Sequence, residues 1–109
     1  MNREPKIFEF ANGRYMFEPH MWPLVIKATK AVSDEDVKSA AVRGTIIIEG
    51  GECATALEWM QNMYGTFLQV ERHSDGKIGS FRSHEFELVS YRSKENPNII
   101  VGPGASSEK

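Results

Sequence analysis

The dipeptide Asn12-Gly13 constrains the fold of this chain more than any other local feature. It separates two apolar-rich stretches at positions 6–11 and 14–18. A two-residue type I′ turn needs positive φ at both of its positions, and Asn-Gly adopts that conformation at low cost. We therefore expect an antiparallel hairpin. Counting outward from the turn, four aromatic side chains share one face as two cross-strand pairs, Phe8 with Phe17 and Phe10 with Tyr15.

A second dipeptide of the same kind, Asp75-Gly76, lies between residues 66–72 and 77–81. The two-residue turn rule predicts another antiparallel hairpin here, with Val70 opposite Phe81. After a short break, residues 85–91 resume the alternation of apolar and polar side chains, which indicates one more strand. These features together predict a largely antiparallel sheet.

Length and composition indicate one globular domain. The chain has 109 residues, of which 40% are hydrophobic and 26% are charged, values typical of folded proteins rather than of disordered ones. We expect a single domain over residues 1–101 and a flexible tail over residues 102–109, where Gly, Pro and Ser predominate. Residues 99–101 would fit a short edge strand within that domain.

Two segments are predicted to be helical. Ser33-Asp-Glu-Asp36 has a hydroxyl N-cap followed by three carboxylates, which favours a short helix through about Ala41. In residues 53–64, apolar side chains recur at spacings of three and four, and Gly65 occupies the place of a left-handed C-cap. This second pattern predicts a longer, amphipathic helix.

The order of these segments predicts an α+β fold, in which a mostly antiparallel sheet carries one long and one short helix on one face. Residues 24–32 favour a further strand, although Pro23 before them would also permit a helix, and the β-branched residues 44–48 favour a central strand. One alternative stays open, because the spacing of residues 44–91 resembles the closing half of a small SH3-like β-barrel. The first hairpin would then be an N-terminal extension of that barrel.

The chemistry of the sequence favours a non-catalytic protein. Cys53 is the single cysteine, which excludes an intramolecular disulfide, and no phosphate-binding glycine motif is present. We predict no cofactor and no metal. A small enzyme is a minor alternative that would need a pocket gathering Cys53 with His20, His73 or His84. Since the chain has neither a long apolar stretch nor a secretion signal, we expect a cytoplasmic protein that does not enter a membrane.

Nucleic-acid binding is a second hypothesis. Four basic residues accompany aromatic side chains on or beside the second predicted hairpin, namely Arg72, Lys77, Arg82 and Arg92. Acidic residues occupy the same strands, and the formal net charge of the chain is -2. The attraction of this region to a phosphate backbone would therefore be small.

Protein binding is the function that the composition favours. Met and Trp side chains are numerous for a chain of this size, and such residues are enriched at the centres of protein interfaces. The predicted binding residues are Trp22, in the connector after the first hairpin, and Glu58, Trp59 and Asn62, on one flank of the predicted long helix. We therefore predict an accessory, inhibitor or immunity-type module that binds another protein. An open sheet edge also predicts pairing with a second copy as a homodimer.

Overall fold

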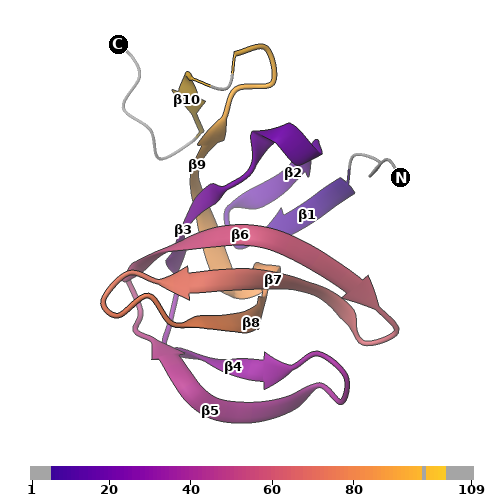
Figure 1. Ribbon diagram of the computed structural model, residues 1–109, viewed down its shortest axis with the longest axis vertical. Coiled ribbons are helices and arrows are strands. Elements are labelled where there is room, and N and C mark those ends of the chain that lie inside the picture. Colours follow the sequence, from indigo (N-terminus) through magenta and orange to yellow (C-terminus); the bar gives the residue numbers. More distant parts are fainter. Residues whose placement is uncertain (1–5, 97, 103–109) are drawn as a thin grey trace.

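The computed structural model of the chain describes residues 6–96 and 98–102, which form a nearly all-β fold (Figure 1). Two 3-10 turns, η1 and η2, interrupt the series of strands. In chain order the elements are β1 (Lys6–Phe10), β2 (Gly13–Phe17), η1 (Pro19–Met21), β3 (Leu24–Ala28), β4 (Val32–Asp36), β5 (Ala41–Ile48), β6 (Cys53–Asn62), β7 (Gly65–Arg72), β8 (Ile78–Arg82), η2 (Ser83–Glu85), β9 (Phe86–Arg92) and β10 (Ile100–Val101).

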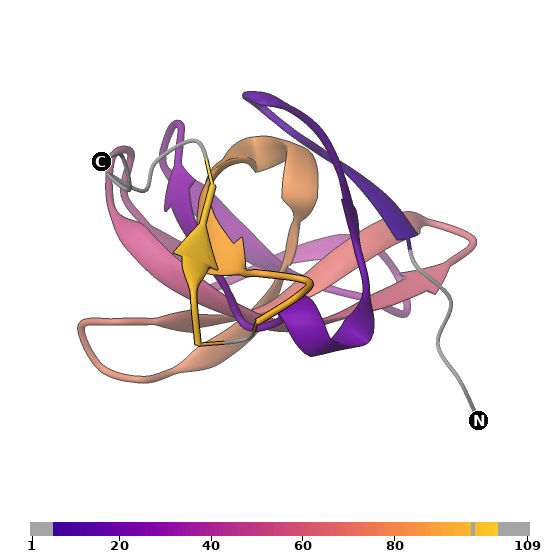
Figure 2. The same cartoon turned by 90° about the horizontal axis from the view of Figure 1, so that it is seen from above.

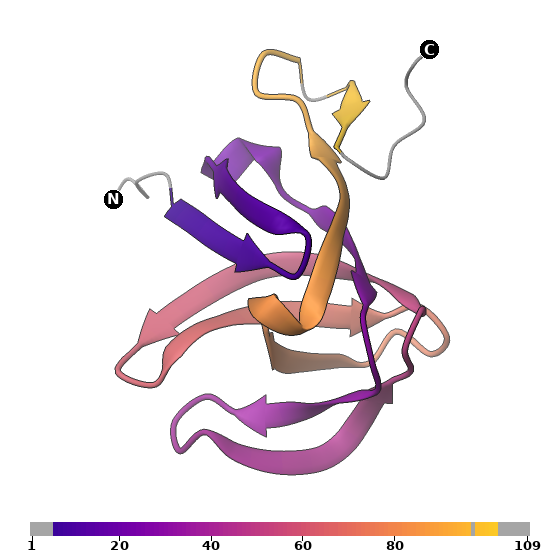
Figure 3. The same cartoon turned by 180° about the vertical axis from the view of Figure 1, so that it is seen from behind.

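The centre of the fold is an antiparallel sheet with the strand order β10-β9-β3-β6-β7-β8. Two hairpins, β1–β2 and β4–β5, form separate two-stranded sheets. The β4–β5 hairpin lies beside β8, whereas the β1–β2 hairpin packs against η2 and β9 (Figures 1 and 3). The two hairpins therefore cover different parts of the central sheet.

One hydrophobic core joins the sheet to both hairpins. Strands bury alternate side chains, as the two-residue period of a β-strand requires. The core side chains of the central sheet are Leu24, Ile26, Ala28, Ala54, Ala56, Leu68, Val70, Phe81, Phe86 and Leu88, and those of the two hairpins are Phe8, Phe10, Phe17, Val32, Ile46 and Ile48. Because each hairpin has one apolar face, neither would be stable without the sheet.

The long helix predicted for residues 53–64 is wrong, because most of this segment is strand β6. Its buried residues are Ala54 and Ala56, which alternate as in a strand, whereas Cys53 and Met60 of the predicted helical stripe are exposed. β6 is hydrogen-bonded to β3 on one side and to β7 on the other. Pairing on both edges outweighs the helical propensity of the Ala, Leu, Glu and Met residues in this segment.

The short helix predicted for residues 33–41 is also wrong. These residues form β4, the following turn and the start of β5. The buried carboxylate of Asp34 does not lie in a helical first turn, but accepts hydrogen bonds from the backbone N–H groups of Thr45 and Ile46, both at 3.0 Å. The register of the β4–β5 pair shifts between Ser33 and Glu35, which interrupts the backbone hydrogen bonds there. The side chain of Asp34 therefore accepts hydrogen bonds from N–H groups that the interrupted ladder would leave without a partner.

The α+β class is therefore wrong, because among the described residues no helix is longer than a three-residue 3-10 turn. The second hairpin, the break at η2 and the strand β9 of the barrel alternative are present. However, residues 44–91 are not a self-contained unit. β3 lies outside that range and yet separates β6 from β9 in the central sheet, so the sheet needs β3 to be continuous.

The first hairpin forms, but its register differs from the prediction by two residues. Phe8 lies opposite Tyr15, and the two-residue loop begins at Ala11. A shift of two residues leaves every side chain on its original face, so the four aromatic rings share one face as predicted. The predicted partners touch along diagonals, with ring-centroid distances of 6.0 Å between Phe8 and Phe17 and 6.1 Å between Phe10 and Tyr15.

The side chain of Asn12 gives the physical reason for this register. Its Nδ2 donates a hydrogen bond to the carbonyl of Leu88 (3.0 Å), and its Oδ1 accepts one from the N–H of Leu88 (2.9 Å). The N–H of Ala11 also donates to the carbonyl of Phe86, at 2.7 Å. Figure 3 shows the loop of the hairpin beside β9, where these three bonds attach it. The loop is thus positioned by the neighbouring strand as well as by its own turn propensity.

The second hairpin also forms with a different register. Phe81 does not lie opposite Val70, because residues 73–76 form the loop in place of a two-residue turn. The carboxylate of Asp75 accepts a hydrogen bond from the N–H of Lys77 at 3.1 Å, which stabilises this longer loop.

The other predicted strands are confirmed in part. Residues 24–28 form β3, but residues 29–31 of the strand predicted at 24–32 do not belong to it. Residues 44–48 are a strand, but the prediction of a central strand is wrong, because β5 pairs with β4 in a separate two-stranded sheet. β9 forms the strand predicted at residues 85–91, starting at Phe86. The short edge strand that residues 99–101 would fit is present as β10 at residues 100–101, which pairs with the end of β9. Of the predicted tail, residues 103–109 lie outside the described residues, so their flexibility stays a prediction.

Replacing Asn12 with Ala should detach the hairpin loop from β9. The substitution removes two hydrogen bonds to one backbone unit, and we expect a loss of about 1–3 kcal/mol in the free energy of unfolding. Urea unfolding monitored by tryptophan fluorescence would measure this loss. Asn98→Ala, at an exposed asparagine, is the control, and equal stability of the two variants would contradict the anchoring role of Asn12.

Candidate protein-binding surface

Seven aromatic rings form a continuous cluster that covers one end of the central sheet. Neighbouring ring centroids in this aromatic cluster lie 5.2–6.5 Å apart, distances at which edge-to-face and offset contacts are favourable. Its members are Phe8, Phe10, Tyr15, Phe17, Trp22, Trp59 and Tyr91. The cluster therefore gives the surface above it a rigid base.

Trp22 and Trp59, which the sequence suggested on two different surfaces, meet at one ring. Both indoles contact Phe8 edge-on, with centroid distances of 5.6 Å for Trp22 and 5.7 Å for Trp59. Both are partly buried against the core. The ammonium group of Lys6 lies 5.9 Å from the centre of the Trp59 ring, within the range of a cation–π contact. Each indole thus seals the edge of the core and keeps part of its surface accessible.

Glu58 and Asn62, the other two predicted binding residues, do not join these indoles in one patch. Glu58 is exposed, but as the strand neighbour of Trp59 it points to the opposite face of β6. The amide of Asn62 donates to the carbonyl of Val37 (2.8 Å) and accepts the N–H of Tyr64 (2.8 Å). Asn62 therefore holds the β6–β7 turn in place and links it to the β4–β5 turn.

Further apolar side chains, outside the predicted binding residues, are exposed in the structure. Ile7 and Met16 lie opposite each other in the β1–β2 ladder, on its outer face, and are 55% and 59% exposed. We call these two residues the hairpin patch. The sequence did contain a signal for it, because residues that alternate with Phe8 and Phe10 must point away from the core. A second exposed group at the β6–β7 turn consists of Met60, Met63 and Tyr64.

A cavity of about 210 Å³ opens beside the hairpin patch. It lies between β1 on one side and the start of β7, the end of β8 and η2 on the other. Its lining residues are Ile7, Phe8, Glu9, Thr66, Arg82, Ser83 and His84. The lining residues therefore include a guanidinium, two hydroxyls, an imidazole and a carboxylate, and the rim of the opening is apolar at Ile7. Such a cavity can accept a polar side chain from another molecule.

Arg82 is a fixed wall of this cavity. Its Nε donates to the carboxylate of Glu35 at 3.1 Å, and its Nη1 donates to the carbonyl of Tyr64 at 2.8 Å. The guanidinium carbon lies 4.6 Å from the centre of the Phe67 ring, which is only 1% exposed and is not part of the main core cluster. Arg82 therefore joins β8 to β4 and to the start of β7, and it covers an otherwise separate aromatic ring.

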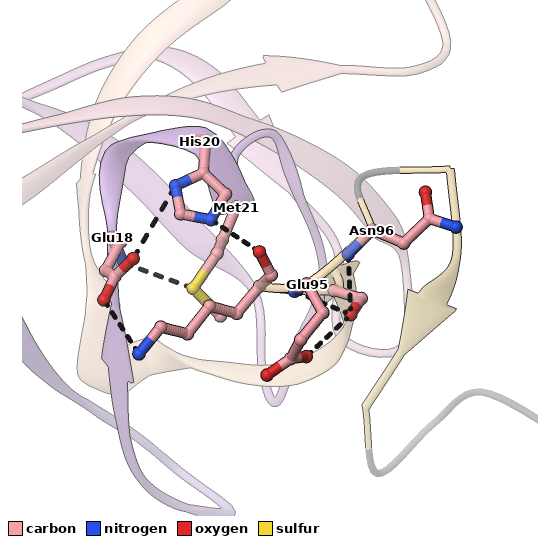
Figure 4. A network of polar contacts seen from close by, with 7 residues as sticks. Glu18, His20, Met21, Glu95 and Asn96 are labelled. Atoms are coloured by element: carbon pink, nitrogen blue, oxygen red, sulfur yellow. Dashed lines mark hydrogen bonds and ion pairs between the residues drawn. The ribbon is translucent and has the colours of Figure 1, made fainter.

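The connector that carries Trp22 is fixed by a polar network between η1 and the loop after β9 (Figures 2 and 4). The carboxylate of Glu18 pairs with Nζ of Lys94 at 3.2 Å and lies 3.7 Å from Nδ1 of His20. Nε2 of His20 lies 3.0 Å from the carbonyl oxygen of Lys94, a geometry in which the imidazole donates. His20 thus has a structural role in positioning the connector.

The four basic residues of the nucleic-acid hypothesis do not gather on one surface. Arg72 and Lys77 lie at the β7–β8 loop, where the guanidinium of Arg72 forms an ion pair with Asp75. Arg82 lies at the opposite end of β8, and Arg92 ends β9. Arg72 and Arg82 are already paired with the carboxylates of Asp75 and Glu35. The four basic residues therefore do not form one site for a phosphate backbone.

The residues of the enzyme alternative are not gathered in the cavity, which contains only His84 of the four. Cys53 is exposed at the start of β6, and the imidazole of His73 lies 2.7 Å from the hydroxyl of Thr55. Within residues 6–96 and 98–102, no three His, Cys, Asp or Glu side chains are arranged to hold a metal ion. No helix in the described part of the chain is long and apolar enough to span a lipid bilayer.

In comparisons with known proteins, no family model, no curated protein and no solved structure matches this chain.

Replacing Arg82 with Ala should destabilise the fold strongly. The substitution leaves the partly buried Glu35 without its cation and uncovers Phe67, for which we expect a loss of about 2–4 kcal/mol in the free energy of unfolding. Arg43→Ala is the matched control, because Arg43 is exposed and its 3.8 Å pair with Asp36 should contribute at most about 1 kcal/mol. Chemical denaturation of both variants would test this, and similar losses would contradict the bridging role of Arg82.

The ion pair of Asp75 with Arg72 should be visible in a pH titration. The hydrogen bond from Arg72 and then that from the Lys77 N–H lower the pKa of Asp75 from 3.8 to about 2. The carboxylate therefore stabilises the fold above about pH 4, and this stabilisation is lost as the pH falls through about 2. Carboxyl NMR would measure the pKa. In Arg72→Gln it should rise towards 3.8, and an unchanged value would show that Arg72 is not the main cause.

Proposed function

We propose that this chain is a non-catalytic module that binds another protein, as an accessory, inhibitor or immunity-type protein, in the cytoplasm. The observation that carries the proposal is the hairpin patch, Ile7 and Met16, exposed directly beside the 210 Å³ cavity. Apolar side chains next to a polar cavity are the usual composition of an interface centre with its hydrogen-bonding surroundings.

The rigidity of this surface supports the proposal. The hairpin patch stands on the aromatic cluster, and the hairpin loop is fixed to β9 by the amide of Asn12. On the other side of the cavity, Arg82 is held by Glu35 and Tyr64. A surface whose backbone and walls are already ordered loses little conformational entropy on binding, which favours affinity.

The charges beside the hairpin patch also favour a protein partner over a nucleic acid. On the outer face of the hairpin, Glu9 and Arg14 form an ion pair at 2.7 Å, and both side chains are exposed. At the cavity, Glu35 compensates the charge of Arg82. A nearly neutral surface gains little from phosphate contacts, whereas it can bury apolar area against a protein.

Photo-crosslinking in cells that express the full chain would test the proposal. A photoreactive amino acid at position 7 or 16 should give a covalent adduct with one protein, whereas the same group at Ser74 should not. Ser74 is exposed and follows the end of β7, at the opposite end of that strand from the cavity residue Thr66. An adduct with the mass of two chains would identify the partner as a second copy.

The expected adduct should also depend on the apolar character of the patch. Met16→Glu adds a charge at an exposed position, so the fold should persist by circular dichroism while the adduct formed from position 7 decreases at least about tenfold. Adducts of equal yield at positions 7, 16 and 74, or none at positions 7 and 16, would contradict the proposal.

A further inference from the structure

We propose that the outer edge of β1 at Ile7 binds an extended segment of the partner protein by strand addition, and that an Asp or Asn of this segment enters the cavity. The inference rests on the proposed function, because it specifies how the partner is recognised at the same surface. It makes two separate claims, one about the backbone of β1 and one about the side chain that the cavity accepts.

The backbone claim follows from the ladder of the first hairpin. Residues of an antiparallel pair alternate between those bonded to each other and those whose N–H and C=O point away from the partner strand. The pair Phe10 and Gly13 closes the two-residue loop and is of the bonded kind, so Glu9 and Ile7 point their backbone groups away from β2. The carbonyl of Glu9 indeed accepts a hydrogen bond from Oγ of Ser83, outside the hairpin, at 3.0 Å.

The corresponding backbone groups of Ile7 are available. Within the described residues, no hydrogen bond joins the backbone of Ile7 to another element, and Ile7 lines the cavity. The backbone of an added strand can accept a hydrogen bond from the N–H of Ile7 and donate one to the carbonyl of Ile7, as in the ladder of a sheet. The edge of β1 is covered by η2 at Glu9, whose carbonyl accepts a bond from Ser83, so a partner segment would pair with β1 at Ile7, beyond that contact.

Other edges of the fold are less suitable for strand addition. The β5 edge is irregular, because the β4–β5 register shifts and Gly44 has a φ of +73°. In addition, the guanidinium of Arg72 already binds the carbonyl of Ile47 at 2.9 Å. β8 lies beside β4, and β10 has only two residues. Bulged, covered and short edges resist pairing with another chain.

The side-chain claim follows from the cavity lining. In an added strand, the residue after the one paired with Ile7 points to the opposite face, which carries Phe8. On that face the side chain of the partner residue would meet three hydrogen-bond donors, the hydroxyl of Thr66, the imidazole of His84 and the guanidinium of Arg82. Nε and Nη1 of Arg82 already donate to Glu35 and Tyr64, so Nη2 is the Arg82 nitrogen that would donate. A short side chain with acceptor oxygens suits these donors and the small volume. Asp and Asn meet both conditions.

Selection of peptides on the full-length chain would test both claims. A random heptapeptide library displayed on phage is the probe, and the selected peptides should share an Asp or Asn. On binding, hydrogen exchange at the amide of Ile7 should slow, because this N–H enters a ladder bond. The variant Ile7→Pro removes the donor from an open edge, where proline is tolerated, and should weaken peptide binding at least about tenfold. The control Ile7→Val keeps the donor and should bind within about threefold of the original chain.

A second variant keeps the test decisive if Ile7→Pro does not fold. Thr66→Val keeps the shape of the side chain and removes its hydroxyl, so the preference for Asp or Asn over Ala at the inserted position should fall at least about threefold. Peptides that bind without slowing exchange at Ile7, or no selected peptide at all, would overturn the strand-addition inference. In that case, a crosslinked adduct at positions 7 and 16 would still support protein binding. Absence of that adduct would overturn the proposed function itself.

Discussion

The attachment of the aromatic hairpin to β9 is the contact on which the packing of the core depends. A primary amide carries one acceptor and donors in the same arrangement as a peptide unit, so the side chain of Asn12 bonds the backbone of Leu88 as another strand would. This bond pair satisfies part of the β9 edge and holds four aromatic rings over the sheet. Without it, Trp22 and Trp59 would lose the ring of Phe8 that both contact.

The same attachment defines the candidate binding surface. It fixes β1 at a set distance from η2, where Ser83 adds a bond to the carbonyl of Glu9, and the cavity lies between these elements. On the far side, Arg82 is immobilised by a carboxylate, a carbonyl and an aromatic ring. The cavity thus follows from contacts that also stabilise the fold, so a substitution that disrupts the proposed binding surface at these contacts should also lower stability.

Several side chains with apparent functional value are used for structure instead. Arg72 and Arg82, which suggested a nucleic-acid site, are engaged in ion pairs that hold a loop and a hairpin. Asp34, at a predicted helix start, satisfies two backbone N–H groups of β5, and His20 positions a connector. Within the part of the chain that the structure describes, the exposed Ile7 and Met16 and the outward backbone groups of Ile7 have no such structural role, and the functional proposals rest on them.

The sequence by itself determined the turns and the strands whose pattern is unambiguous, because turn conformation and two-residue alternation are local properties. Asn12-Gly13 and Asp75-Gly76 therefore located the β1–β2 and β7–β8 hairpins, and the faces of Phe8 and Phe17 followed, whereas the β4–β5 and β6–β7 hairpins were not foreseen. Only the tertiary structure decided the register of the first hairpin, since it depends on bonds to Leu88. The register of the second hairpin follows from a local bond of Asp75 that the two-residue turn rule did not anticipate. The tertiary structure also decided that residues 53–62 form a strand, because pairing with β3 and β7 outweighs local helical propensity. The cavity could not be foreseen for the same reason: its walls come from segments that are more than fifty residues apart in the chain.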